Sequence, residues 1–338
     1  MTNLQKHLAF FNKEGELNFD EPSHRYYDND NQTFLSVTQF LSEFEPKFDE
    51  NFWGMYTALK DNGKKVKPDI ANKAILINGV SHKLTKLHKD DIFKHWYSAT
   101  VAKWKGISAE ACLRGNATHN YLEDTINKSK GLFTGNTDNH IITPNYKPKL
   151  IDTVNDLNAT DLHNKFPFIH ARLKQYIERD CIIYAEKRVK LDFALLAGMI
   201  DVPIIKRGSK RFCIVDWKTN KDEFKYTSGY MKKILVGKDW VKSDIFVPTN
   251  DKFADPISHL PYCKINLYSL QLSLYAYILE CWGFELIDKG LEIIHIRPGQ
   301  EPKVIKIQYL REEIELIIKY RLEQINRPFF DVAKYTKQ

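Results

Sequence analysis

The alternation of apolar and polar positions in the first third of the chain predicts a hairpin, a short helix and a long helix. Residues 24–38, HRYYDNDNQTFLSVT, alternate aromatic and β-branched residues around an Asp/Asn cluster, which predicts a β-hairpin. Thr38 is a candidate cap for a helix through FLSEF that ends near Pro46. Residues 93–127 have helical periodicity, whereas residues 61–91 are lysine-rich and predict a basic loop containing one strand-like segment, AILING.

The remainder of the chain predicts the order helix, three strands, helix, strand, helix. A helix at about 161–179 precedes the strand candidates IIYAEKRVKL, FALLAGMIDVPII and RFCIVDW. The apolar helix INLYSLQLSLYAYILECW, the strand LEIIHIRP and the amphipathic helix YLREEIELIIKYRLEQI follow. Residues of about 128–160 and 219–260 are polar and predict insertions. We therefore expect an N-terminal extension over 1–92, with the hairpin and the basic loop, and a core over 93–338.

The composition favours some classes of protein and argues against others. The 338 residues carry a formal net charge of +7 with a pI near 8.9, which favours a polyanionic partner. The 5 cysteines lie far apart without a CxxC pair, which argues against a disulfide framework, a zinc knuckle and an iron-sulfur cluster. The chain has neither a membrane-length apolar run nor a secretory leader pattern, so we expect a cytoplasmic protein that binds no membrane.

Three charges interrupt apolar runs in the stretch GMIDVPIIKRGSKRFCIVDWKTNK, residues 198–221. Asp216 and Lys218 are two residues apart and share one face of a strand. In a hairpin that turns near residues 208–210, Asp201 falls close to opposite Asp216, and two such carboxylates repel unless one is protonated or a cation lies between them. Mg²⁺ suits such oxygen ligands, and Lys218 would orient a water or neutralise charge on a phosphate. Either acid alone is more often an edge or turn residue.

Two pairs with helical i, i+4 spacing add to this pattern. His119 and Glu123 share a helix face one turn after Gly115, whose missing side chain permits close approach of a backbone or a phosphate. The histidine is a candidate metal ligand, or equally a histidine hydrogen-bonded at a helix end. Gln271 and Tyr275 lie in the apolar helix, where a buried amide needs a partner, in the site or in an ordinary core hydrogen bond.

Taken in order, these motifs resemble the RecB-like branch of the PD-(D/E)XK nuclease superfamily. The matching segments are GxxxHxxxE from Gly115, GxxD from Gly198, DxKT from Asp216 to Thr219, and QxxxY from Gln271, all within about 110–300. The resemblance implies an α/β protein with a restriction-endonuclease-like core, in which helices flank a central mixed β-sheet. It also implies dependence on Mg²⁺ or Mn²⁺ and cleavage of DNA to 5′-phosphate and 3′-hydroxyl ends.

The same resemblance assigns roles by position. His119, Asp201 and Asp216 would ligate the metal ion, with the backbone carbonyl of Trp217 as a further ligand. Lys218 would position the attacking water. The residues expected to support Lys218 or to contact the DNA backbone are Gln271 and Tyr275, and those expected in other supporting positions are Gly115, Glu123, Glu186 and Thr219.

The chain also departs from the family pattern. Ile200 replaces the proline of the superfamily's name, and Asn116 stands where the branch usually has threonine. The cysteine quartet of the iron-sulfur members and a phosphate-binding GxxxxGK[ST] loop are both absent from the sequence. We therefore expect a stand-alone, phage-type nuclease, placed in the host cytoplasm if it is phage-encoded.

Several functions fit this pattern. The first choice is an exonuclease acting on DNA ends, double-stranded or single-stranded, in recombination, repair or phage DNA processing, with a single-strand-annealing or replication protein as a candidate partner. A structure-selective or nicking endonuclease is the second. An RNA-directed nuclease and a non-catalytic DNA-binding or assembly module that kept the fold remain open. The sequence leaves polarity, processivity and oligomeric state undetermined.

Overall fold

The computed structural model describes residues 17–20, 23, 25–128, 150–237 and 239–327. The chain forms two compact units, one comprising Met1–Pro46 with Thr118–Gln338, the other Lys47–Ala117. The predicted boundary between residues 92 and 93 lies inside the long helix α5 (Asp91–Lys128). The two units divide later in the same helix, and its last turns, from Thr118, belong to the larger unit. The N-terminal hairpin also belongs to the larger unit, because its strands extend a sheet of that unit.

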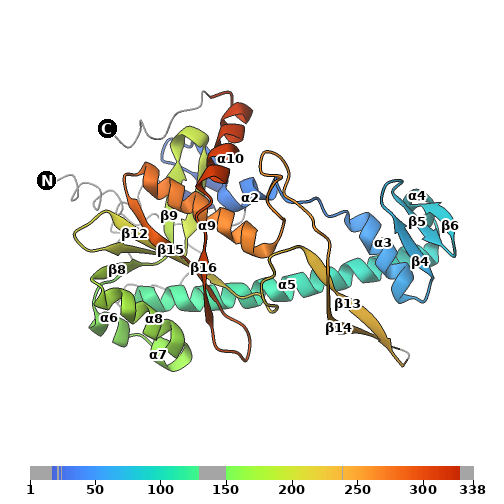
Figure 1. Ribbon diagram of the computed structural model, residues 1–338, viewed down its shortest axis with the longest axis horizontal. Helices are drawn as coiled ribbons and strands as arrows, with labels where there is room; N and C mark the ends of the chain where they lie inside the picture. Colours follow the sequence, from blue (N-terminus) through green and yellow to red (C-terminus); the bar gives the residue numbers. More distant parts are fainter. Residues whose placement is uncertain (1–16, 21–22, 24, 129–149, 238, 328–338) are drawn as a thin grey trace. The chain divides into compact units, whose positions relative to one another are not determined.

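The larger unit contains most of the secondary structure (Figure 1). Its strands are β1 (Asn18–Asp20), β2 (Arg25–Tyr27), β3 (Thr33–Ser36), β7 (Leu150–Ile151), β8 (Cys181–Tyr184), β9 (Lys187–Leu191), β10 (Leu196–Ile200), β11 (Val202–Lys206), β12 (Arg211–Lys218), β13 (Gly229–Val236), β14 (Asp239–Pro248), β15 (Glu285–His295) and β16 (Lys303–Ile307). Its helices, besides the end of α5, are α2 (Val37–Ser42), α6 (Val154–Asn158), α7 (Leu162–Lys165), α8 (Pro167–Glu178), the 3-10 helix η1 (Asp192–Ala194), α9 (Lys264–Cys281) and α10 (Arg311–Gln324).

A six-stranded mixed sheet, in the order β16-β15-β12-β11-β8-β7, forms the centre of this unit. β12 pairs parallel with β15, and the other neighbours pair antiparallel. Alternate residues of β12 point to opposite faces: Phe212 and Ile214 pack with α9 and α10, whereas Cys213 and Val215 pack with α8. The expected α/β class with a mixed sheet flanked by helices is therefore confirmed.

The predicted N-terminal hairpin is confirmed as β2 and β3, which pair antiparallel in a second sheet of order β1-β2-β3-β10-β9. The helix that follows begins at Val37, two residues earlier than a cap at Thr38 requires. Its N-cap is Ser36, whose hydroxyl accepts a hydrogen bond from the backbone N–H of Gln39. The prediction of Thr38 as the cap was therefore wrong, because both hydroxyl residues precede the same apolar run and Ser36 already has the extended backbone of a cap.

Two predicted strands are each divided between the two sheets. IIYAEKRVKL forms β8 and β9, which separate at Glu186, where the backbone has a φ of 45°. FALLAGMIDVPII forms η1, β10 and β11, and the chain passes from one sheet to the other at Asp201. The single helix predicted at about 161–179 is likewise two helices, α7 and α8, because Pro167 begins a new helix.

The lysine-rich segment predicted as a basic loop is folded. It lies in the smaller unit, which contains α3 (Glu50–Asp61), β4 (Val66–Asp69), β5 (Ala74–Ile77), β6 (Val80–Lys83), α4 (Leu84–Leu87) and the first part of α5. β4, β5 and β6 form an antiparallel sheet, and Ile75 packs with Phe52, Met55 and Leu59 of α3. The prediction of a loop was wrong, because the few apolar residues between the lysines are enough to form a small core with helix α3.

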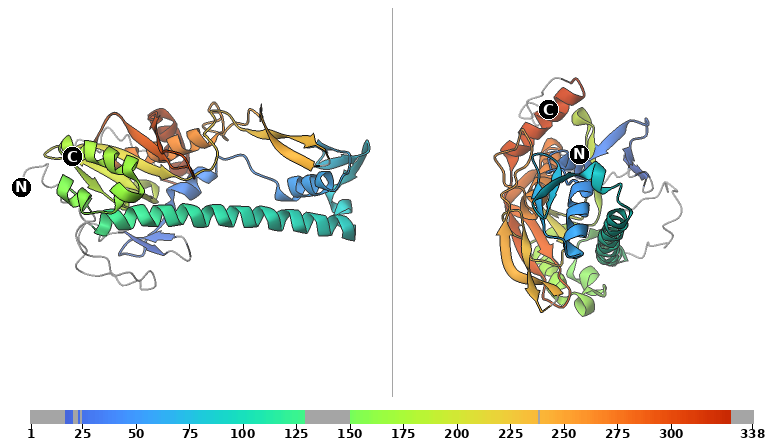
Figure 2. Two further views of the ribbon diagram at one scale, coloured as in Figure 1. Left: turned by 90° about the horizontal axis from the view of Figure 1, so that it is seen from below. Right: turned by 90° about the vertical axis from the view of Figure 1, so that its right-hand side faces the viewer.

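The structure describes the predicted insertion at about 128–160 only in part, whereas it describes nearly all of the one at about 219–260. Most of the first, residues 129–149, lies outside the described residues, and its end contains β7 and α6. The second contains the antiparallel hairpin β13–β14, which extends away from the six-stranded sheet in Figure 1 and in the left view of Figure 2. Among the described residues, no helix is long and apolar enough to cross a membrane.

A buried ion-pair network joins α8 to the central sheet. Glu292 of β15, 1% exposed, accepts hydrogen bonds from Arg172 at 2.5 and 3.2 Å and from Lys306 on the neighbouring strand. Burial by itself would raise the pKa of Glu292, but the hydrogen bonds from Arg172 and Lys306 lower it below its ordinary value. The ionised carboxylate therefore stabilises the folded sheet.

Glu292→Gln is expected to lower the free energy of unfolding at pH 7 by about 3 kcal/mol, because it leaves two cations beside a neutral amide. Since the pKa of Glu292 is lowered in the folded state, the wild type loses this stabilisation as the pH falls through that pKa, and the difference shrinks in acid. Urea unfolding at pH 7 and pH 3.5 measures it. Glu285→Gln, on the exposed end of the same strand, is the control, and an equal loss in both variants would contradict the network's role.

Candidate active site

The register of β11 and β12 brings two acidic residues together. Val202 pairs with Val215, so Asp201 stands level with Asp216 on the neighbouring strand. Asp216 lies on the same face of β12 as Phe212 and Ile214, which pack against α9, because these residues are an even number of positions apart. Asp201 shares a face with Ile205 for the same reason, and Ile205 belongs to the same core. Both carboxylates therefore lie on the α9 side of the sheet, as the hairpin spacing predicts.

Asp216 and Lys218 form a buried ion pair on this face. The Nζ of Lys218 lies 2.6 Å from Oδ2 of Asp216, and the side chains are only 14% and 3% exposed. Burial raises the pKa of Asp216 to about 6, with repulsion from Asp201 adding to the effect and Lys218 opposing it. Burial would lower the pKa of Lys218, but the carboxylates of Asp216 and Asp201 raise it, so the ammonium stays charged.

Asp201 is held by two further groups. Its Oδ2 accepts a hydrogen bond of 3.0 Å from the backbone N–H of Trp217, and Nδ1 of His119 lies 3.4 Å from the same oxygen. His119 stands on the last part of α5, within the larger unit, and keeps a side chain that is 32% exposed. The helix predicted to bring a histidine to the acidic pair therefore places His119 beside Asp201.

Gln271 and Tyr275 of α9 lie over the face of the sheet that carries the two carboxylates. Tyr275 is buried, and Nε2 of Gln271 donates a hydrogen bond of 3.5 Å to its hydroxyl oxygen. A Cβ built at Gly198 would come within 2.7 Å of Cε1 of Tyr275, so glycine at this position lets the tyrosine ring lie on the backbone of β10. Burial raises the pKa of Tyr275, which stays a neutral phenol next to the acids.

The remaining predicted residues occupy the surroundings. Glu186 lies between β8 and β9 and not within a strand, and its N–H donates a 2.8 Å hydrogen bond to the carbonyl oxygen of Asp201. Glu123 follows His119 by one turn of α5, and Thr219 directly follows β12. Gly115 belongs to the smaller unit, so the structure gives it no place relative to the two acids.

Three residues that the motifs did not indicate, Tyr268, Asn220 and His295, lie around Lys218, and Tyr268 contacts its ammonium. The Nζ of Lys218 lies 4.6 Å from the centre of the Tyr268 ring, and the Tyr268 hydroxyl donates to the side chain of Asn220 at 3.0 Å. His295, buried at the end of β15, lies with Nε2 2.8 Å from the carbonyl oxygen of Asn220. Tyr268 precedes Gln271 by one helical turn, which is a signal in the sequence, whereas the pairing of His295 with Lys218 depends on the parallel strand.

The donor set fits a hard divalent cation. Mg²⁺ is commonly held by one or two carboxylates together with waters and substrate phosphate oxygens, so it does not need a cage of many side chains. In the described part of the chain, no group of three or more His, Cys, Asp or Glu side chains is arranged to hold a metal ion. The pair Asp201 and Asp216 is nevertheless suitable, because burial and the repulsion from Asp201 both raise the pKa of Asp216, and a cation near both carboxylates would offset these two effects.

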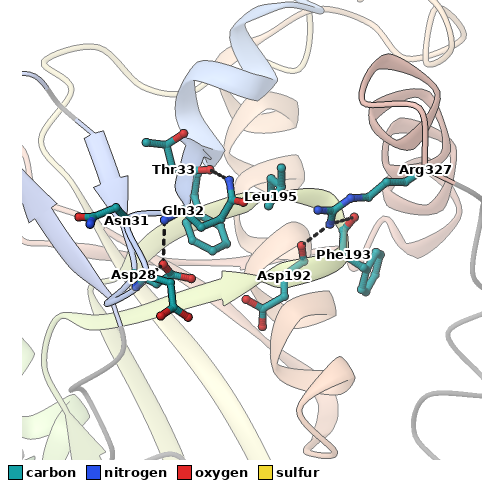
Figure 3. A pocket seen from close by; sticks show the side chains of 10 residues that line it. Asp28, Asn31, Gln32, Thr33, Asp192, Phe193, Leu195 and Arg327 are labelled. Atoms are coloured by element: carbon teal, nitrogen blue, oxygen red, sulfur yellow. Dashed lines mark hydrogen bonds between the residues drawn. The ribbon is translucent and has the colours of Figure 1, made fainter.

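A hollow of about 690 Å³ elsewhere in the larger unit is lined by none of the candidate site residues (Figure 3). It lies between the β2–β3 turn and the η1 segment, where Arg327 donates to the carbonyl oxygens of Asp192 and Phe193. The Asp28 side chain accepts from the N–H of Gln32 and closes the turn. These contacts are internal to the fold and indicate no chemistry.

Comparison of the chain with protein-family models, with curated proteins and with solved structures finds no match in any of the three. The assignment of function therefore depends on the geometry around Asp201 and Asp216.

Proposed function

We propose that the protein is a metal-dependent nuclease of the RecB-like PD-(D/E)XK type, which hydrolyses phosphodiester bonds in DNA. The observation that carries the proposal is the meeting of Asp201 and the buried Asp216 on one face of the sheet, with Lys218 paired to Asp216. A mixed sheet with helices on both faces supports a restriction-endonuclease-like core.

Each residue of the site has a role in this proposal. Asp201 and Asp216 would hold Mg²⁺ or Mn²⁺, with His119 and the backbone carbonyl of Trp217 as further ligands. When bound, the ion supplies Lewis-acid stabilisation of charge on the phosphate. Lys218 would orient the attacking water and neutralise charge on the phosphate oxygens, and Tyr268 would hold its ammonium in place. Gln271 and Tyr275 would keep the α9 side of the site closed.

An exonuclease acting on DNA ends remains the preferred form, with a role in recombination, repair or phage DNA processing. Cleavage assays with labelled linear duplex, circular duplex, single-stranded DNA and RNA, each with Mg²⁺ or Mn²⁺, test the proposal. Cleavage of linear but not circular substrates supports the exonuclease. Nicking of circles supports the endonuclease, and cleavage of RNA alone would redirect the assignment. A wild-type protein that binds DNA but cuts no substrate would instead support a non-catalytic module.

Metal binding is expected to depend on pH through Asp216. The folded-state pKa of about 6 exceeds the ordinary value of 3.8, so this group's contribution to stability is full below the lower value and is lost as the pH rises through about 6. A cation binds the ionised form and restores stability there. Saturating Mg²⁺ is therefore expected to raise the melting temperature at pH 7.5 and to have little effect at pH 5. The control is NaCl at equal ionic strength, and a shift that is larger at pH 5 would contradict the site.

A further inference from the structure

A cavity of about 840 Å³ lies beside the end of β12. Three segments of the larger unit line it: the residues that follow β12, the hairpin β13–β14, and the start of α9. The hairpin contributes lining residues from both of its strands, and it extends from the sheet in Figure 1 and in the left view of Figure 2. This volume lies within the range of about 300–1,000 Å³ that is usual for pockets that enclose organic ligands.

The cavity begins next to the candidate active site. Asn220 belongs to its lining, and the same side chain accepts the hydroxyl of Tyr268, whose ring lies under the ammonium of Lys218. Phe224, also in the lining, stacks on His295 at 4.2 Å between ring centroids, and His295 pairs with Lys218 across the strands. A ligand in the cavity would therefore lie one side chain away from Lys218.

The lining combines aromatic rings with lysines. The rings belong to Phe224, Tyr230, Phe246 and Tyr262, and Tyr230 is 58% exposed. The cations are Lys221, Lys225 and Lys264. Aromatic faces together with basic side chains are the means by which proteins bind unpaired nucleotides, because every base has a face to stack and every linkage has a negative charge.

The lining also carries the acidic side chains Asp222, Glu223, Asp244 and Asp251, so base stacking and not charge distinguishes a single strand from a duplex here. Glu223 is paired with Arg297 and Lys303, but Asp244 is exposed in the same cavity. The bases of a duplex are already stacked on one another, whereas an unpaired base has a face free to stack on an aromatic ring. Tyr230 provides such an exposed ring in this cavity.

We propose that this cavity is a subsite for an unpaired nucleotide of the substrate strand, next to the phosphodiester that is cut. The subsite deepens the proposed nuclease function, on which it rests, by naming a single-stranded end as the form of the substrate. Single-stranded DNA and single-stranded RNA share the chemistry of base and phosphate that it would recognise.

Binding without cleavage tests this subsite independently of catalysis. With EDTA present, the full-length protein is titrated into fluorescein-labelled single-stranded DNA, single-stranded RNA and blunt duplex of equal length. Single strands are expected to bind at least about tenfold more tightly than the duplex. Tyr230→Ser is expected to weaken single-strand binding by about 5- to 100-fold, because stacking of one base is lost. A stronger effect on DNA than on RNA would identify the preferred sugar.

Tyr226→Ser is the matched control, since Tyr226 is 73% exposed, precedes Tyr230 by four residues and does not line the cavity. It is expected to change the affinity less than twofold. Equal affinity of the wild type and Tyr230→Ser for single strands, or tighter binding of duplex, would overturn the subsite. Failure of the nuclease proposal appears differently: the wild type would bind single strands through Tyr230 yet cut none of them with Mg²⁺.

Discussion

If the proposed nuclease function holds, Asp216→Asn is expected to lower the rate of metal-dependent DNA cleavage by about 10³-fold or more, since it removes the charge that would hold the cation at the reacting phosphate. Asp216 is 2% exposed and paired with Lys218 at 2.6 Å, so no neighbouring carboxylate can take its exact place without movement of the strand. The amide has nearly the shape of the carboxylate, which keeps the packing of β12. Single-turnover cleavage of labelled DNA at saturating Mg²⁺ measures the effect.

The control for this variant is Asp288→Asn, which makes the same chemical change at an exposed position of the neighbouring strand β15. Asp288→Asn is expected to cleave like the wild type. Thermal melting of both variants separates loss of the site from loss of the fold. Full activity in a folded Asp216→Asn variant would remove Asp216 from the site and contradict the proposed nuclease.

Lys218→Met is expected to reduce cleavage by about 10²- to 10⁴-fold, which is the range for a positioned group that acts on the attacking water. It should also destabilise the protein at pH 8 by about 3–5 kcal/mol, because Asp216 then remains as a buried charge without its partner. Burial already raises the pKa of Asp216 to about 6, and loss of the ammonium raises it further. The carboxyl is then protonated at pH 5, where the destabilisation is expected to be much smaller.

Urea unfolding at pH 5 and pH 8, together with cleavage assays at pH 8, tests both effects of this substitution. Lys206→Met, at the exposed end of β11 in the same sheet, provides the comparison and is expected to change neither. A loss of stability in Lys218→Met that is equal at both pH values would show that packing of the methylene chain matters and that the charge does not.

The placement of Asp201 opposite Asp216 was predictable from the sequence, because a tight turn between two apolar runs fixes which residues pair. The side of the sheet on which Lys218 lies followed from alternation along one strand. The helix that brings His119 was also predicted, since its periodicity is continuous from residue 93. These features depend on neighbours close in the sequence.

Features that depend on distant neighbours were not predictable. His295 reaches Lys218 only because β15 pairs parallel with β12, and nothing in LEIIHIRP specifies that partner. The division of FALLAGMIDVPII between two sheets was missed for a related reason, because both sides of Asp201 are apolar and look like one strand. The small lysine-rich sheet was missed because its few apolar residues gain their partner from a helix elsewhere in the sequence.

Asp201 stands where the chain leaves the five-stranded sheet and enters the six-stranded sheet. Its backbone is thus anchored on one side by β10, paired with the N-terminal hairpin strand β3, and on the other by β11. The Asp201 backbone is consequently connected to both sheets, while the β11–β12 register places its side chain level with Asp216. Through β3 and β10, the N-terminal hairpin is thereby joined to one side of the candidate active site.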